Sequence, residues 1–307
     1  MYFFIIINKN KIFIIFIFPL ILSEIYRYHR HKQNRICICT IGKQENKYIK
    51  EYVEYYKHFG IDKIFLYDNN DLDDEYFDNI IEKYKNEDFV EIKNWRGIRH
   101  PQMKMYNDCY FNNYKKYEWL IFNDIDEYLY LKSYNNAKDF LSKNKFKNCE
   151  NIQLNWLLYT DNNLIYYQNK PLKIRFKEKE LYLNKRKIYK LSNGKSILRG
   201  HIPNIKITNF HCISKDLKTC DGFGIVRNFL KPDYKYYYFK HYYSKSTEEF
   251  IDKLKKGDVY KIKNKNKIKF YFSYNKITNE KLRYIEKKTG ENLSYYKNKL
   301  KLSKKLT

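Results

Sequence analysis

Apolar and polar residues along the first half of the chain follow two alternating periods. Short apolar runs at 36–40, 63–67, 90–95 and 119–123 are typical of buried strands. Between these runs, apolar residues recur every three or four positions, which predicts helices at 46–59, 76–84 and 103–116. Strands that alternate with helices predict an α/β fold with a mostly parallel sheet covered on both faces.

The last of these apolar runs ends in a closely spaced group of carboxylates. In the stretch 119–129, Asp124 and Asp126 are two positions apart, so they would face the same side if the strand continued through them. Hard divalent cations such as Mn²⁺ or Mg²⁺ prefer carboxylate oxygens and can share them with a diphosphate. The pattern predicts a metal site at Asp124 and Asp126; the alternative is an ordinary acidic turn.

A third aspartate follows the second predicted strand. In parallel sheets, ligands bind beyond the carboxyl ends of the strands, and Asp68 occupies such an end. We therefore expect Asp68 to lie near the metal site and to contact the donor. The alternative is a turn residue, because Asp68-Asn69-Asn70 is also good turn chemistry.

The later sequence contains a signal for the start of a helix. The segment 246–249, Ser-Thr-Glu-Glu, matches a capping box, in which Ser246 caps the helix and Glu249 reaches back to it. The exposed N–H groups of a helix N-terminus suit a diphosphate, and Lys245 adds a full positive charge. We predict that Lys245 and Ser246 bind the donor diphosphate; the alternative is a capped surface helix.

Several blocks in this order resemble glycosyltransferase family 92 and related family-2-like transferases. They are 40–46, 48–60, 67–69, 123–129, 194–198, His211, and 241–250 with Lys253 and Gly257. The resemblance covers residues 36 to 258 and rests on the order and spacing of the blocks. It implies a GT-A fold with a Rossmann-like sheet, a nucleotide-diphosphate sugar donor, Mn²⁺ or Mg²⁺, and hexosyl transfer with inversion at the anomeric carbon. It also implies a donor contact for Lys195.

Two histidines fall in these late blocks. A neutral imidazole can complete an oxygen-rich Mn²⁺ site. The resemblance supports His211 and His241 equally. We prefer His241 as the metal or diphosphate contact, because it lies close to Lys245 in the sequence, and keep His211 as the second choice.

An inverting transferase also needs a base that removes the proton of the acceptor hydroxyl. Asp161 follows the apolar segment 152–159, and Asp221 precedes Gly222-Phe223-Gly224. Both lie in the sequence after the predicted strand 119–123 and its metal site, on the acceptor side. For each, the alternative is an ordinary turn residue. We predict that Asp161 is the catalytic base.

The charge balance points to an anionic partner. The chain of 307 residues carries 61 basic and 35 acidic residues, a formal net charge of +26. Lysines are scattered throughout, densest at 253–269 and 297–305, and no nucleic-acid motif accompanies them. This favours an anionic membrane surface and no specific nucleic acid, beside a nucleotide-sugar donor and a glycan or glycoconjugate acceptor. The alternative function is a basic membrane- or nucleic-acid-associated binding protein that keeps the fold without turnover.

The N-terminal segment 1–35 supports membrane association. Its apolar run at 12–22 has 11 residues, whereas a spanning helix needs about 20. A short signal anchor, a cleavable signal sequence and an interfacial segment all remain open. The basic residues that follow the run place the catalytic domain on the cytoplasmic side.

The six cysteines predict no disulfide framework at this chain length, and Cys37 and Cys39 read as core residues. A reducing cytoplasm fits this interpretation best; the alternative is a luminal location. We expect three regions: the possible anchor at 1–35, the GT-A domain at 36–258, and a basic, irregular C-terminal extension at 259–307.

Overall fold

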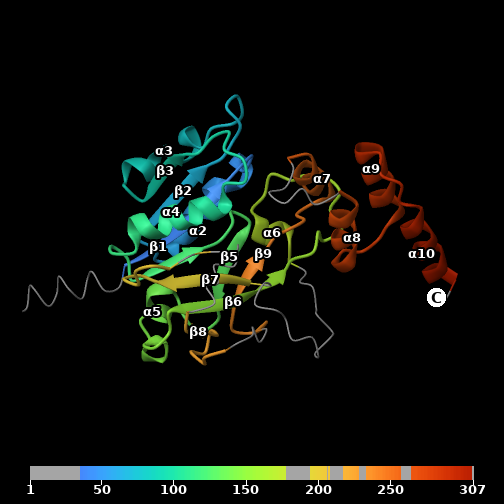
Figure 1. Cartoon of the computed structure of the whole chain (residues 1–307). Helices are drawn as coiled ribbons and strands as arrows, with labels where there is room; N and C mark the ends of the chain where they lie inside the picture. The colour runs from blue at the N-terminus through green and yellow to red at the C-terminus, as the bar shows by residue number, and fades with distance from the viewer. Residues whose placement is uncertain are drawn as a thin grey trace, which may run out of the picture.

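The computed structural model describes residues 35–177, 194–205, 207, 217–227, 233–256 and 264–305. Within these ranges, the strands form one curled sheet with the order β3-β2-β1-β4-β7-β6-β9-β5, and β8 pairs with β6 (Figure 1). The predicted apolar run at 12–22, His211 and Gly257 lie outside the described residues.

The first half of the chain alternates strands and helices as predicted. The four strands in this half run parallel to one another. Each predicted element is present, with bounds that differ by a few residues. The elements are β1 (Ile36–Gly42), α2 (Asn46–His58), β2 (Lys63–Asp68), α3 (Asp78–Asn86), β3 (Val90–Asn94), α4 (Gln102–Asn113) and β4 (Trp119–Phe122).

The second half extends the same sheet with mixed directions. β7 is antiparallel to both β4 and β6, β6 is parallel to β9 and β8, and β5 is antiparallel to β9. The mixed α/β fold with a mostly parallel sheet is therefore confirmed. The elements are β5 (Glu127–Leu131), α5 (Ala137–Leu141), a 3-10 turn (Asn144–Phe146), β6 (Asn151–Leu158), α6 (Leu172–Arg175), β7 (Gly194–Arg199), β8 (Thr219–Cys220) and β9 (Tyr237–His241).

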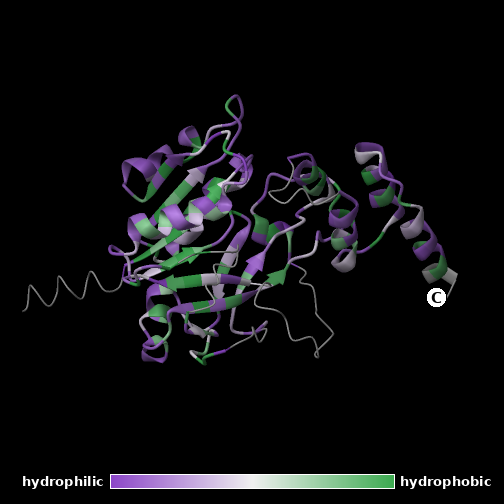
Figure 2. Cartoon of the chain, in the orientation of Figure 1, coloured by the Kyte–Doolittle hydropathy of each residue, from purple (hydrophilic) through white to green (hydrophobic). Residues whose placement is uncertain are grey.

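Helices cover both faces of the sheet, and the alternation along β1 shows how. Ile36 and Ile38 belong to the core that packs under α2 and α3, whereas Cys37 and Cys39 belong to the core under α4. Successive strand residues point to opposite faces, so a run that is apolar at every position needs cover on both sides. Figure 2 shows the consequence, with apolar strands inside and polar outer surfaces on the helices.

The C-terminal part is helical where the structure describes it. A third apolar cluster joins α7 (Thr247–Lys256) to α8 (Asn264–Tyr274), α9 (Asn279–Thr289) and α10 (Ser294–Lys305). These helices extend to one side of the sheet in Figure 1. Among the described residues, no helix combines the length and the apolar character that crossing a bilayer requires.

Two disulfides correct the interpretation of the cysteines. Cys39 on β1 is bonded to Cys109 on α4, and Cys149 is bonded to Cys220 on β8. Cys37 is a free, buried core residue, as predicted, but its neighbour Cys39 is cross-linked. The partners are 70 and 71 positions apart in sequence, so spacing alone gives no sign of the pairing.

Candidate functional site

A large cavity lies beyond the carboxyl ends of the parallel strands, where the sheet topology predicts a ligand. It has a volume of about 790 Å³. Its wall is formed by the loops after β1, β2 and β3, by the acidic turn after β4, and by the last turns of α7. We call it the donor cavity. It is lined by Ile41, Gly42, Lys43, Glu45, Asn69, Asp71, Leu72, Gly97, Ile98, Arg99, His100, Pro101, Gln102, Asp124, Ile125, Asp126, Lys253 and Lys256.

The acidic residues after β4 reach this cavity through a turn. The strand ends at Phe122, and the Glu127 N–H donates to the Asp124 carbonyl over 3.0 Å. Asp124 and Asp126 both line the donor cavity, although the strand geometry that predicted their shared side does not persist. Asp124 is about one-third exposed and Asp126 is buried, with 7% of its side chain exposed.

Tyrosine hydroxyls of α2 fix the position of this turn. Tyr52 donates to the Asn123 side-chain oxygen over 2.9 Å, and Tyr56 donates to the Glu127 carbonyl over 2.9 Å. The Asn123 amide donates to the Tyr56 hydroxyl over 2.8 Å. A buried hydrogen-bond network of this kind holds the carboxylates in one arrangement.

Each carboxylate of the acidic turn has a lysine partner. The Lys195 Nζ lies 3.0 Å from an oxygen of Asp124 and 3.6 Å from one of Glu127, and the Lys253 Nζ lies 2.9 Å from Asp126. Burial disfavours the charge on Asp126, but Lys253, His241 and Lys245 together outweigh it and hold the pKa of that carboxyl well below its usual range. Lys195 is almost fully buried and does not line the cavity, whereas Lys253 does.

Asp126 belongs to a buried group of three possible metal ligands. One atom each from Asp126, Glu127 and His241 lie within 4.8 Å of one another. The Glu127 Oε1 and the His241 Nδ1 are buried 3.9 Å apart, and neither has a hydrogen-bond partner among the described residues. Burial lowers the pKa of His241, which keeps the imidazole in the neutral, ligating form. Oxygen and imidazole ligands suit Mn²⁺, so the donor set fits a divalent cation.

The helix start at α7 is the predicted capping box. The Glu249 N–H donates to the Ser246 Oγ over 3.3 Å, and the Ser246 N–H donates to the Glu249 carboxylate over 2.9 Å. Arg175 pairs with the same carboxylate at 2.7 Å. The Glu249 carboxylate therefore already offsets the partial positive charge at the N-terminus of α7. Ser246 is fully buried.

Lys245 faces a second cavity, of about 440 Å³, between the start of α2 and α7. Its Nζ lies 3.5 Å from Glu45 and 3.8 Å from the centre of the Tyr48 ring. Glu45 lines both cavities and also pairs with Lys256 at 2.7 Å. The structure thus places Lys245 beside the donor cavity, with Glu45 between them.

The other predicted site residues take structural positions. Asp68 is buried, pairs with Arg96 at 2.9 Å and does not line the donor cavity, although Asn69 does. Asp161 is 1% exposed and lies 2.6 Å from the fully buried Lys281. The carboxylate has almost no exposed surface and is in contact with a lysine, which is typical of a structural residue. Its assignment as the catalytic base stays a prediction.

Sequence reasoning missed Glu45, Glu127, Lys253 and Lys256 as site residues. Lys253 and Lys256 are three positions apart on α7, one helical face that follows the capping box. That spacing could have predicted that both lysines lie on the same side of the helix. Glu45 carries no comparable signal, because its role depends on two lysines at least 200 positions away.

Open α/β sheets bind their ligands at the carboxyl ends of the strands, and the donor cavity lies there with carboxylates and lysines in its wall. The sequence profile of glycosyltransferase family 92 matches residues 32–293. The chain belongs to that family, and its fold is of the GT-A type.

Individual relatives match over shorter stretches. A glycosyltransferase family 92 protein of Ricinus communis is 30% identical over 122 residues, which cover 39% of this chain and 21% of that protein. One of Oryza sativa subsp. japonica is 28% identical over 122 residues, covering 38% and 20%. The alignments thus span about a fifth of these relatives. The structure of S. aureus TarS in complex with UDP-GlcNAc is 19% identical, covers 71% of this chain and 64% of that chain, and has a TM-score of 0.38.

Proposed function

We propose that this protein is a metal-dependent glycosyltransferase that moves a sugar from a nucleotide-diphosphate donor to a glycan or glycoconjugate acceptor with inversion. The observation that carries the proposal is the donor cavity, in which Asp124 and Asp126 face Lys253 and Lys256. Carboxylates and lysines at the ends of parallel strands supply a metal and charges for a diphosphate. Membership of family 92 supports sugar transfer as the reaction.

Asp126 and His241, with Glu127 behind them, would hold Mn²⁺ or Mg²⁺ in this proposal. A bound divalent cation would stabilise the charge that develops on the departing diphosphate. Lys253 is well placed to share in that stabilisation, because one-third of its side chain is exposed to the cavity side of Asp126. We assign Lys195 a structural role, since it pairs with Asp124, lies 3.6 Å from Glu127 and keeps the turn intact.

The experiment is a screen of nucleotide sugars for Mn²⁺-dependent hydrolysis, with Asp126→Asn as the test variant. We expect Asp126→Asn to abolish hydrolysis while the melting temperature stays within a few degrees. Asp71→Asn is the matched control, because Asp71 lines the same cavity but is 65% exposed and pairs with Lys43. Turnover by Asp126→Asn with normal metal dependence would refute the metal assignment, and retained anomeric configuration in the product would refute inversion.

We also propose that the protein works at an anionic membrane surface. The net charge of +26 supports this, and the two disulfides favour an oxidising compartment over the cytoplasm that the cysteine count suggested. Binding to phosphatidylserine vesicles should exceed binding to phosphatidylcholine vesicles and should weaken as salt rises. Equal binding to both vesicles would refute it, and free thiols at all six cysteines of protein isolated from cells would refute the compartment.

A further inference from the structure

A separate cavity of about 300 Å³ lies against β6, and none of its lining residues lines the donor cavity. Four aromatic rings form much of its wall: Phe223, Tyr234, Tyr236 and Tyr237. The Phe223 ring packs edge-on against Tyr237, with 5.0 Å between the ring centres, yet Phe223 remains 45% exposed. We call this the hairpin cavity, because residues 219–227 close it as a hairpin.

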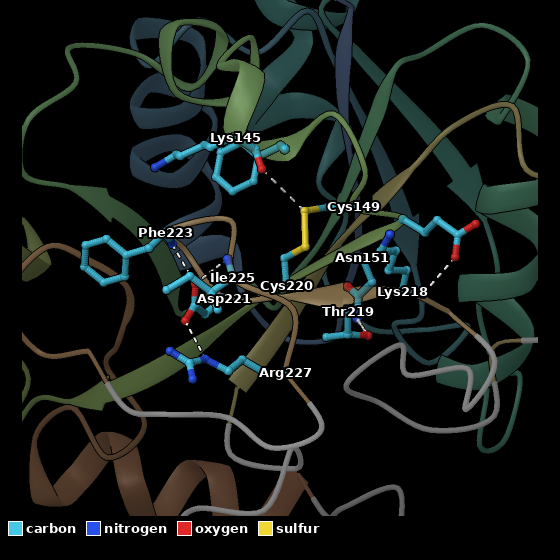
Figure 3. Close-up of a disulfide and its surroundings, with 12 residues drawn as sticks. Lys145, Cys149, Asn151, Lys218, Thr219, Cys220, Asp221, Phe223, Ile225 and Arg227 are labelled. Carbon is cyan, nitrogen blue, oxygen red and sulfur yellow. Dashed lines mark hydrogen bonds and ion pairs between the residues drawn. A yellow bond between two sulfur atoms is a disulfide. The ribbon is translucent and has the colours of Figure 1, made fainter.

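The hairpin is held rigidly. Cys220 and Val226 pair across it, and the Asp221 carboxylate accepts the N–H groups of Phe223 and Ile225 at 2.9 and 3.1 Å. Gly224 has a φ of +81°, and a Cβ there would lie 2.5 Å from a backbone oxygen of residue 145, so the tip requires glycine. Figure 3 shows the Cys149–Cys220 disulfide that ties the hairpin to the body of the protein.

These bonds also settle what Asp221 does. Its second oxygen accepts from the Arg227 Nε over 3.0 Å, so both oxygens are engaged and the residue is 7% exposed. The alternative candidate for the catalytic base is therefore a structural residue of the hairpin. Its function is to present the neighbouring side chains, Phe223 and Arg227, at the cavity.

Among the described residues that line this cavity, Arg227 is the only cation. Of the two lining carboxylates, Asp221 pairs with Arg227 and Asp233 accepts backbone N–H groups of residues 235–237. The Arg227 Nε is used by Asp221, whereas its Nη1 and Nη2 groups make no hydrogen bond within the described residues, and 27% of the side chain is exposed. The remaining fork of a guanidinium fits a carboxylate or phosphate with two parallel hydrogen bonds. Exposed apolar side chains gather beside it, with Ile225 49% and Val226 50% exposed.

We propose that the hairpin cavity binds an acidic sugar unit of the acceptor glycan, with the sugar face on Phe223 and its carboxylate or phosphate on Arg227. Aromatic rings beside a fixed polar group are the chemistry that recognises a sugar, which has apolar faces and a polar rim. The cavity touches β6 at Asn155, and the next residue, Trp156, packs on His241 at 4.9 Å between ring centres. One strand thus contacts both sites. The acceptor role rests on the proposed function; the binding itself does not.

The test measures the affinity of the full chain by calorimetry for three probes: tetragalacturonate, its carboxyl-reduced neutral form, and phosphorylated maltotetraose. The variants are Arg227→Gln and Phe223→Ala. Arg283→Gln is the charge-matched control on the exposed side of α9, and Phe111→Ala is a control of nearly equal exposure, at 46%. All four side chains are partly exposed, so the fold should survive, which thermal unfolding checks.

We expect at least one acidic probe to bind about tenfold more tightly than the neutral one. Arg227→Gln should remove that preference, and Phe223→Ala should weaken both acidic and neutral binding several-fold. The better of the two acidic probes identifies the charged group. Equal losses in Arg227→Gln and Arg283→Gln would show binding by bulk charge and overturn the proposal, as would equal affinity for acidic and neutral probes or no binding at all. Donor hydrolysis should be unchanged in all variants; its absence in the wild type would refute the proposed function and leave the binding result standing.

Discussion

Substitution of Asp161 by Asn separates a structural role from a catalytic one. In the structure, Asp161 and Lys281 form an ion pair at 2.6 Å in which neither side chain has more than 1% of its surface exposed. Tyr271 donates a further hydrogen bond to the same carboxylate. The pair joins the loop after β6 to α8 and α9, so its loss affects the packing of the C-terminal helices.

The expected loss of stability comes from the buried Lys281 ammonium, which the substitution leaves without its counter-ion. Removing one partner of a fully buried ion pair costs about 3–5 kcal/mol, because the remaining charge has no solvent and no counter-ion. For a domain of this size that corresponds to a fall in melting temperature of roughly 10 °C. We expect Asp161→Asn to show this fall by calorimetry, whereas Asp73→Asn, at an exposed position, should change stability by less than about 0.5 kcal/mol.

A second variant makes the reasoning refutable. Lys281→Met combined with Asp161→Asn removes the stranded charge and keeps the length of the side chain, so it should recover most of the lost stability and the donor hydrolysis. A fall of less than about 1 kcal/mol in the single variant would refute the buried-pair argument. A double variant that is stable and hydrolyses donor but fails to glycosylate any acceptor would support Asp161 as the base.

Three further predictions concern the cations and the cross-links. Lys253→Gln should weaken nucleotide-diphosphate binding about tenfold in calorimetry and leave nucleoside binding unchanged, because Lys253 faces the cavity beside Asp126; equal weakening would mean that it does not meet the diphosphate. Cys149→Ser with Cys220→Ser should lower the free energy of unfolding by about 4 kcal/mol for a loop of this length, and an unchanged urea midpoint would contradict the cross-link. Burial lowers the pKa of Lys145 to about 8, so the unfolded chain binds more protons between pH 8 and 10 and stability should rise with pH there. Lys145→Met should lose that rise, and parallel pH profiles for the two proteins would refute the assignment.

The sequence predicted the local elements of the first half well, because each strand and helix there has a clear period. It also located Asp124 and Asp126 at the cavity, since the ends of parallel strands meet at one edge. The prediction succeeded for the wrong local reason: the carboxylates share a cavity through the turn that Tyr52 and Tyr56 fix, and the strand stops before them.

What the sequence could not give depends on partners distant in the chain. Asp161 and Asp68 look like catalytic or binding carboxylates until Lys281 and Arg96 are found against them. Glu127 is the opposite case, because nothing in the sequence was a reason to select it as a ligand. It follows the Asp-x-Asp triplet directly, but it lies beside His241 only because β5 pairs with β9. A pattern along the chain shows which residue types are near each other, and it leaves open which charges the fold neutralises.

The tyrosines of α2 limit how this chain can diverge. With 34 tyrosines and 21 phenylalanines, the sequence invites exchange between the two, since both fill the same core volume. On α2, phenylalanine cannot replace tyrosine without loss of a hydrogen bond. The hydroxyls of Tyr48 and Tyr52 donate to the side chains of Glu249 and Asn123, and those of Tyr55 and Tyr56 donate to the carbonyls of Leu129 and Glu127. A library that randomises Tyr and Phe at buried positions should therefore reject phenylalanine at all four of these positions on α2.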